Sequence, residues 1–110
     1  MKEYTKHYLA AALWTNEFDN YSIKDFDKKS IEKAEEDLND FISYVELDGA
    51  DLSQISYEMI GHDFWLTRNH HGTGFWDRGL GDLGNKLTEW CDKFGEQHCD
   101  IGDDGKVFLY

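Results

Sequence analysis

The segment Ser30–Val45, SIEKAEEDLNDFISYV, carries the clearest helical pattern in this chain. Its apolar side chains recur at intervals of three or four residues and therefore share one face of a helix. They are Ile31, Ala34, Leu38, Phe41, Ile42 and Val45. Ser30 suits the N-cap position, and Asp48-Gly49 provides a stop signal. The pattern predicts an amphipathic helix over about 30–45 whose apolar face packs on a core.

Three more helices are predicted around this segment. Residues 3–15 are apolar on most sides, which indicates deep burial. A short helix is predicted over about 52–60, with Gly61 closing it. The fourth, over about 80–94, has an apolar stripe made by Leu80, Leu83, Leu87, Trp90, Cys91 and Phe94.

Two β-hairpins are predicted, over about 62–77 and about 97–110. In the first, Phe64 and Leu66 alternate with Trp65 and Thr67, and Asn69-His70-His71-Gly72 forms the turn. In the second, the turn is Gly102-Asp103-Asp104-Gly105, and its Asp-Gly step is a strong hairpin signal. We therefore expect a single α+β domain over residues 1–110, with helices packed on a small antiparallel sheet.

The charge balance limits the partners. The chain has 110 residues and a formal net charge of −12, from 23 acidic and 11 basic side chains. Such a surface repels phosphate backbones and anionic lipids, so we expect neither direct nucleic-acid binding nor membrane binding. A basic protein partner would be attracted instead. A cytoplasmic location is expected, because the chain has no long apolar run and begins without the apolar core of a signal peptide.

The densest group of polar and aromatic residues is the stretch 61–79, GHDFWLTRNHHGTGFWDRG. Its candidate site residues are His62, Asp63, Arg68, His70, His71, Asp77 and Arg78. One interpretation is a small enzyme or ligand-binding site with a base, an orienting carboxylate and an anion clamp. The other is structural, with arginine–aspartate pairs that tie the hairpin together. We favour the structural interpretation, because no nucleophile elbow, Walker loop or HExxH motif is present.

The same stretch resembles a family of small uncharacterised bacteriophage proteins. The resemblance lies in HDFWLTRN, an HG turn and GFWDRG over residues 62–79, and it extends through Gly79–Gly84 and the following helix to Ile101–Val107. It thus covers about residues 61–110 and none of 1–60. It implies a phage setting, in the cytoplasm of a bacterial host, but it implies no activity. His70 stands where the family's turn is expected to carry glycine.

No metal or cofactor is predicted. The side chains of a type that binds zinc are His62, His70, His71, Cys91, His98 and Cys99, and their spacing matches no zinc motif. The two cysteines are expected to be free thiols. The glycine-rich stretch 79–84 is not predicted to bind phosphate, because Asp82 already places a carboxylate at the helix start.

The polar face of the 30–45 helix is the other candidate site. Its carboxylates, expected to be exposed, are Glu32, Glu36, Asp37 and Asp40. They form either an ordinary solvated face or a surface that mimics DNA phosphates toward a basic partner, although the lysines within 24–33 count against a pure mimic.

Our leading hypothesis is a small acidic phage-type accessory protein that acts by protein–protein binding and inhibits a host nucleic-acid-handling or defence enzyme. Homodimer formation is a further hypothesis, because Trp65 or Trp76 on an uncovered sheet face would suit self-association.

Overall fold

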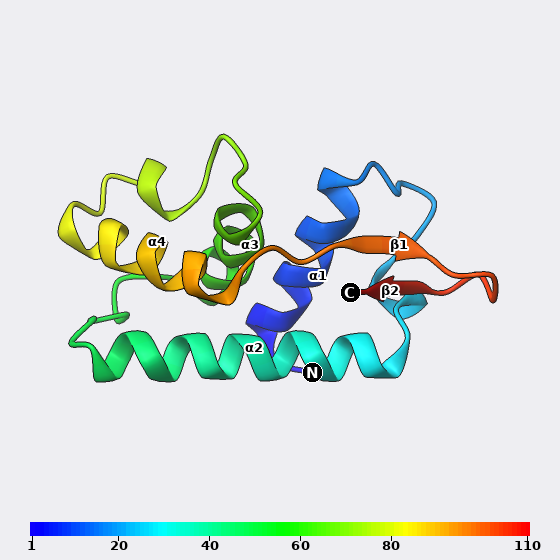
Figure 1. Cartoon of the computed structure of the whole chain (residues 1–110), viewed down its shortest axis with the longest axis horizontal. Helices are drawn as coiled ribbons and strands as arrows, with labels where there is room; N and C mark the ends of the chain where they lie inside the picture. The colour runs from blue at the N-terminus through cyan, green and yellow to red at the C-terminus, as the bar shows by residue number, and fades with distance from the viewer.

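The computed structural model describes residues 1–110 and contains four α-helices and one two-stranded antiparallel sheet (Figure 1). The helices are α1 (Glu3–Thr15), α2 (Lys28–Leu47), α3 (Tyr57–Arg68) and α4 (Asp82–Phe94). The strands are β1 (Cys99–Ile101) and β2 (Val107–Leu109), and short 3₁₀ helices span Ile23–Asp25 and Phe75–Asp77. The predicted α+β class is confirmed.

Helix α2 runs along the length of the molecule, whose longest dimension is 43 Å (Figure 1). The predicted helix over 30–45 is confirmed and is longer than expected at both ends. Asp27, not Ser30, is the N-cap residue, and its carboxylate accepts the Ser30 N–H at 2.8 Å. The Ser30 hydroxyl instead accepts the Leu109 N–H at 2.8 Å, which fastens α2 to the hairpin. At the other end Gly49 takes a left-handed φ of 90°, as the stop signal predicts.

The first predicted hairpin, over 62–77, is wrong. Residues 62–68 belong to α3, which begins after the N-cap residue Ser56, and residues 75–77 form a 3₁₀ helix. The helix predicted over 52–60 coincides with α3 only in its last four residues. The hairpin prediction failed because this part of the chain is buried on all sides: every residue from Asp63 to Arg68 is buried. Apolar residues that alternate in sequence therefore do not define one exposed and one buried face.

Gly61 does not close a helix; it lies inside α3, where the helix crosses α1. A Cβ atom at this position would lie 1.9 Å from the Tyr4 carbonyl oxygen. Only glycine allows the two backbones to approach so closely, and the α1–α3 contact is the most extensive helix–helix contact in the molecule.

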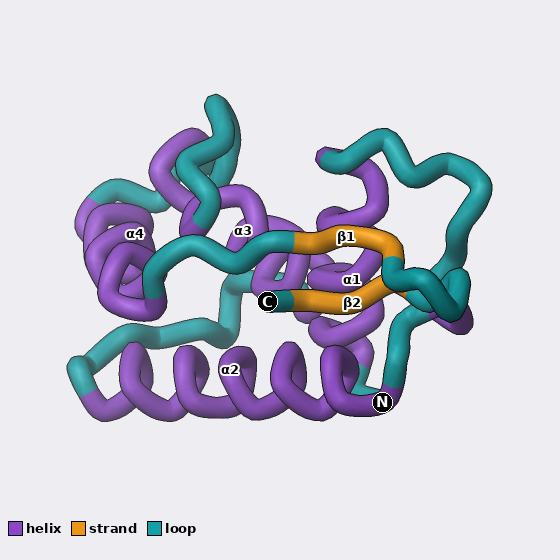
Figure 2. Tube along the Cα trace, turned by 45° about the vertical axis from the view of Figure 1, so that its right-hand side comes forward, coloured by secondary structure: helices purple, strands orange, loops and turns teal.

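The core lies between α2 and the other three helices. Its centre is a stack of aromatic rings in which Phe41 contacts Phe64 and Phe75, at centroid distances of 4.5 and 5.8 Å. The predicted second hairpin and the predicted helix over 80–94 are both confirmed. The strands of the hairpin lie side by side near α1 and the start of α2 (Figure 2), where Asp27 donates its N–H to the Val107 carbonyl at 2.9 Å.

Each of the helices is too short or too polar to traverse a lipid bilayer.

Candidate functional site

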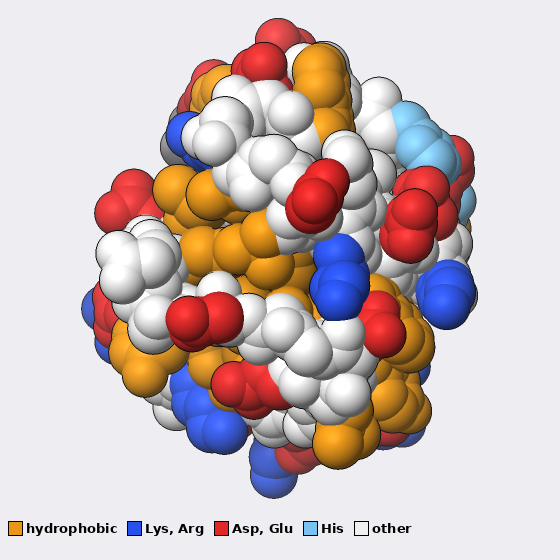
Figure 3. Space-filling view, turned by 90° about the vertical axis from the view of Figure 1, so that its left-hand side faces the viewer, with side chains coloured by type: hydrophobic (Ala, Val, Ile, Leu, Met, Phe, Trp, Pro, Cys, Tyr) orange, Lys and Arg blue, Asp and Glu red, His pale blue; other side chains and the backbone are white.

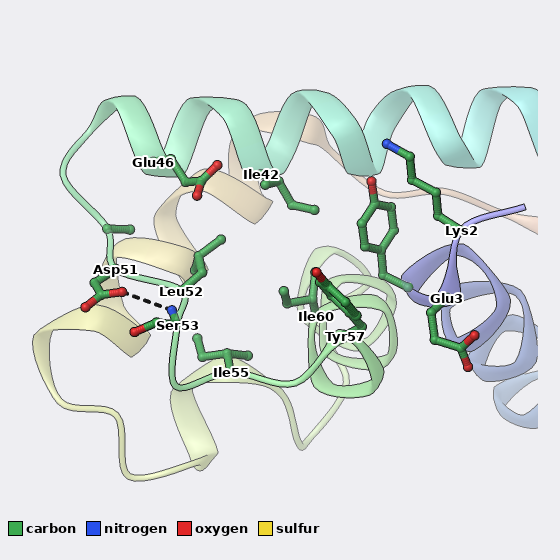
Figure 4. Close-up of a pocket in the computed structure, with 12 residues that line it drawn as sticks. Lys2, Glu3, Ile42, Glu46, Asp51, Leu52, Ser53, Ile55, Tyr57 and Ile60 are labelled. Atoms are coloured by element: carbon green, nitrogen blue, oxygen red, sulfur yellow. Dashed lines mark hydrogen bonds between the residues drawn. The ribbon is translucent and has the colours of Figure 1, made fainter.

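The largest cavity is an apolar groove of about 700 Å³ between α2 and α3, which we call the α2–α3 groove (Figure 4). It is lined by the C-terminal half of α2, the connection 48–56, the first turn of α3 and the start of α1. Its apolar lining consists of Tyr4, Ile42, Ala50, Leu52, Ile55, Tyr57 and Ile60. A cavity of this volume is within the range of small-molecule pockets, about 300–1,000 Å³.

The groove exists because α2 and α3 meet at the Phe41–Phe64 ring stack and at the Asp37–Arg68 ion pair and diverge beyond them. Phe41 of α2 lies on Phe64 of α3, but α3 begins only after the 48–56 connection has crossed the gap. This connection is stiffened locally, because the Ile55 N–H is donated to the Leu52 carbonyl at 3.0 Å. Apolar side chains of the connection therefore line one wall without filling the space between the helices.

Carboxylates stand at the rim of the groove. Glu3 pairs with Lys6 and His7 on its own helix, whereas Glu46 and Asp51 make no ion pair. The side-chain and backbone hydrogen bonds from Ser53 lower the pKa of Asp51, so this carboxylate is ionised at neutral pH.

The one cation at this rim is Lys2, whose ammonium donates to the Asn39 side chain at 3.2 Å. The end of the molecule that carries the 48–56 connection shows hydrophobic side chains in a central hollow, with acidic and some basic side chains around it (Figure 3).

Three of the seven candidate site residues from 61–79, Asp63, Arg68 and Arg78, lie in ion pairs with a buried partner. Asp63 is fully buried in α3, and both its oxygens accept hydrogen bonds from Arg78 at 2.8 Å. This pair raises the pKa of the Arg78 guanidinium. It is a bidentate arginine–aspartate pair of the kind that the structural interpretation predicts, although it ties a helix to a loop rather than two strands.

Arg68 is also buried, and its partner was not foreseen. Its Nη1 donates at 3.0 Å both to the Asp37 carboxylate of α2 and to the Tyr8 hydroxyl of α1. Its other donors reach the carbonyls of Phe94 and Gly95, at the end of α4. One guanidinium thus joins three helices to the helix that carries it.

Asp37 was predicted to be an exposed carboxylate on the polar face of α2, and this is wrong. Only 5% of Asp37 is exposed, because its side chain turns inward to Arg68 while Lys33 covers it from outside at 3.0 Å. A buried guanidinium requires a nearby carboxylate, and Asp37 supplies it. The Tyr8 hydroxyl completes the network by donating to Gln97 at 2.7 Å, and burial raises the pKa of Tyr8.

The remaining candidates do not join one site. His62 is half-buried and stacks on Trp14, with ring centroids 5.8 Å apart. His70 is exposed just after α3 with a left-handed φ of 59°, so the chain turns there, but the turn follows a helix and is not the predicted hairpin turn between two strands. His71 is half-buried in the same turn, and Asp77 is exposed in the second 3₁₀ helix. The structure brings together Asp63 and Arg78, with His62 on the rim of the same small hollow, and leaves the others apart.

Trp65 or Trp76 was expected on an uncovered sheet face that would suit a dimer. Instead, Trp65 is buried in α3, and Trp76 is exposed in the second 3₁₀ helix.

The histidine and cysteine side chains do not assemble a metal centre, because no three His, Cys, Asp or Glu side chains come close enough to hold an ion. Both cysteines are free and buried. Burial raises the pKa of the Cys99 thiol to about 12 and that of Cys91 well above its ordinary value, so neither is a reactive thiolate.

Of the carboxylates predicted on the polar face of α2, Glu32 and Glu36 are exposed and Asp40 is half-buried, and none of these three makes an ion pair. Sequence reasoning missed the α2–α3 groove. The available signal was the apolar content of the 48–56 connection, which follows a helix stop yet contains Ala50, Leu52 and Ile55.

Comparison of the chain with models of known families, with curated proteins and with solved structures gives no match. The resemblance to the bacteriophage family therefore stays a prediction, and any functional argument has to come from the site itself.

Proposed function

We propose that this protein is a binding protein, an acidic accessory factor that contacts a basic partner protein. The observation that carries the proposal is the placement of its charges. Glu32, Glu36 and Glu46 are exposed along α2 and have no ion-pair partner, so they are available to cations of another molecule.

The alternative, an enzyme or ligand-binding domain that uses the 61–79 residues, has less support. Arg68, Asp63 and Arg78 are all engaged in ion pairs that hold helices and loops together. A group that already makes a bidentate buried pair is not free to bind or activate a substrate.

The phage setting and the inhibition of a nucleic-acid-handling or defence enzyme belong to the same proposal. Enzymes that handle nucleic acid carry basic surfaces, and a carboxylate face that covers such a surface would compete with DNA or RNA. Lys29 and Lys33 on the same helix restrict the acidic face to one strip of α2, so we expect a specific contact and not a general polyanion effect.

Affinity capture from a bacterial lysate at low and high salt tests this proposal. The double variant E32K/E36K should lose a basic partner that the unchanged protein retains at low salt. The matched control E89K/D92K makes the same charge change on exposed residues of α4 and should retain the partner. Equal loss in both variants would show a nonspecific charge effect and would refute a specific contact on α2.

A further inference from the structure

We propose that the α2–α3 groove is the docking site for a segment of the partner that carries large apolar side chains beside lysine or arginine. This inference rests on the proposed function and adds the place where the apolar part of the contact lies. The exposed strip of α2 would attract the partner, and the groove would hold it.

The lining of the groove is apolar surface that the fold itself leaves uncovered. Tyr57 is 64% exposed, although its ring lies beside the Tyr4 ring at 6.0 Å, and Ile42 and Leu52 are half-buried. Figure 4 shows these side chains on opposite walls of the same space. Tyrosine is one of the residue types enriched in interface hot spots, and concave binding sites are mostly lined by apolar and aromatic side chains.

The charges at the rim identify the chemistry of the occupant. Glu46 and Asp51 stand at the end of the groove where α2 runs into the 48–56 connection, and neither has a cation of its own chain. The Lys2 ammonium at the opposite end is held by Asn39. A lysine or arginine of a bound segment would therefore meet two unpaired carboxylates as its apolar neighbours enter the groove.

The same charges disfavour a second copy of this chain. Each copy carries a net charge of −12, so the approach of another molecule to an acidic rim is opposed by repulsion. An amphipathic basic helix lying in a groove is a recurrent mode of peptide recognition, and it satisfies both the apolar lining and the acidic rim.

A fluorescently labelled peptide of about 14 residues, roughly four helical turns, provides the probe. It carries leucine on one face and lysine on the other, and binding is followed by anisotropy. Two matched peptides replace every leucine with serine, or every lysine with glutamate. We expect the leucine–lysine peptide to bind at least about tenfold more tightly than either, because the groove requires both properties.

Variants of the groove locate the binding. Leu52→Ser should weaken it about tenfold, and Tyr57→Ala should do the same while keeping the fold, because Tyr57 is largely exposed. The double variant E46Q/D51N removes the two charges but keeps oxygen acceptors, and should weaken binding several-fold at low salt and little at high salt. The matched control E89Q/D92N should bind as the unchanged protein does.

Several results would overturn the docking proposal. Unchanged affinity in Tyr57→Ala together with loss in E32Q/E36Q would refute the groove and leave the proposed function standing. Unchanged affinity in all the carboxylate variants would refute both. Tight binding of the serine–lysine peptide would refute a site that requires apolar side chains. Displacement of the labelled peptide by hexylammonium, a small cation with one apolar chain, as effectively as by unlabelled peptide would refute a peptide site. Concentration-dependent dimerisation that Tyr57→Ala abolishes would assign the groove to a second copy.

Discussion

The α1–α3 crossing and the α2–α3 groove lie next to each other along α3, and the crossing side is closed while the groove side is open. On the closed side, Gly61 brings the backbones of α1 and α3 into contact. On the open side, α3 meets α2 through the Phe41–Phe64 stack, and beyond it the apolar lining has no partner. The difference separates residues that hold the fold from residues that are free to bind.

The polar side chains divide in the same way. Asp37 and Glu36 are neighbours on α2, yet Asp37 is buried against Arg68 while Glu36 is exposed and unpaired. Charge type alone therefore does not predict a role on this helix. The direction in which each side chain points decides whether it stabilises the domain or faces a partner.

The largest effect among the test positions should come from breaking the buried Asp37–Arg68 ion pair. Asp37→Ala leaves the buried Arg68 guanidinium without its carboxylate, and we expect a loss of about 3 kcal/mol in the free energy of unfolding. Urea unfolding followed by circular dichroism measures it. Glu36→Ala, one residue away and exposed, should change stability by less than about 0.5 kcal/mol. Similar losses in the two variants would contradict the separation of a buried structural carboxylate, Asp37, from an exposed one, Glu36.

A somewhat smaller effect is expected at the helix crossing. Gly61→Ala places a methyl group where the Tyr4 carbonyl oxygen stands, so α1 and α3 must move apart, at a cost of about 2–3 kcal/mol. The control is Gly72→Ala, because no atom lies within 4 Å of the position its methyl group would occupy. A melting temperature for Gly61→Ala that equals that of Gly72→Ala would show that the crossing is not closely packed.

These two positions also show how far sequence reasoning reaches in this chain. The helices over 30–45 and 80–94 were predictable because each has one buried and one exposed face, which gives a clear periodicity. Helix α3 was not, because its second half, Asp63–Arg68, is buried on every side and has no periodicity to detect, and Gly61 then resembled a helix end. The partner of Arg68 could not be predicted either, because Asp37 and Arg68 are 31 residues apart in sequence and only the fold brings them together.

The candidate site was still less predictable. A groove is a space between elements, and its existence depends on where α3 begins, which the sequence analysis placed in the wrong segment. The exposed carboxylates Glu32 and Glu36 were identified correctly as surface residues, because helical periodicity fixes the outer face of α2. Their role in binding stays a prediction.

The smallest effect on stability should come from the open side. Tyr57→Ala removes a ring that is 64% exposed and has only an edge contact with Tyr4, so we expect a loss below about 1 kcal/mol. Thermal unfolding measures it, and Phe64→Ala, a fully buried ring on the same helix, provides the contrast at about 3–5 kcal/mol. If Tyr57→Ala were as costly as Phe64→Ala, the groove lining would be part of the core and not a surface left open for a partner. A small loss combined with weakened peptide binding would show that recognition depends on the exposed Tyr57 ring, whereas stability depends on the buried Phe64 ring two turns further along α3.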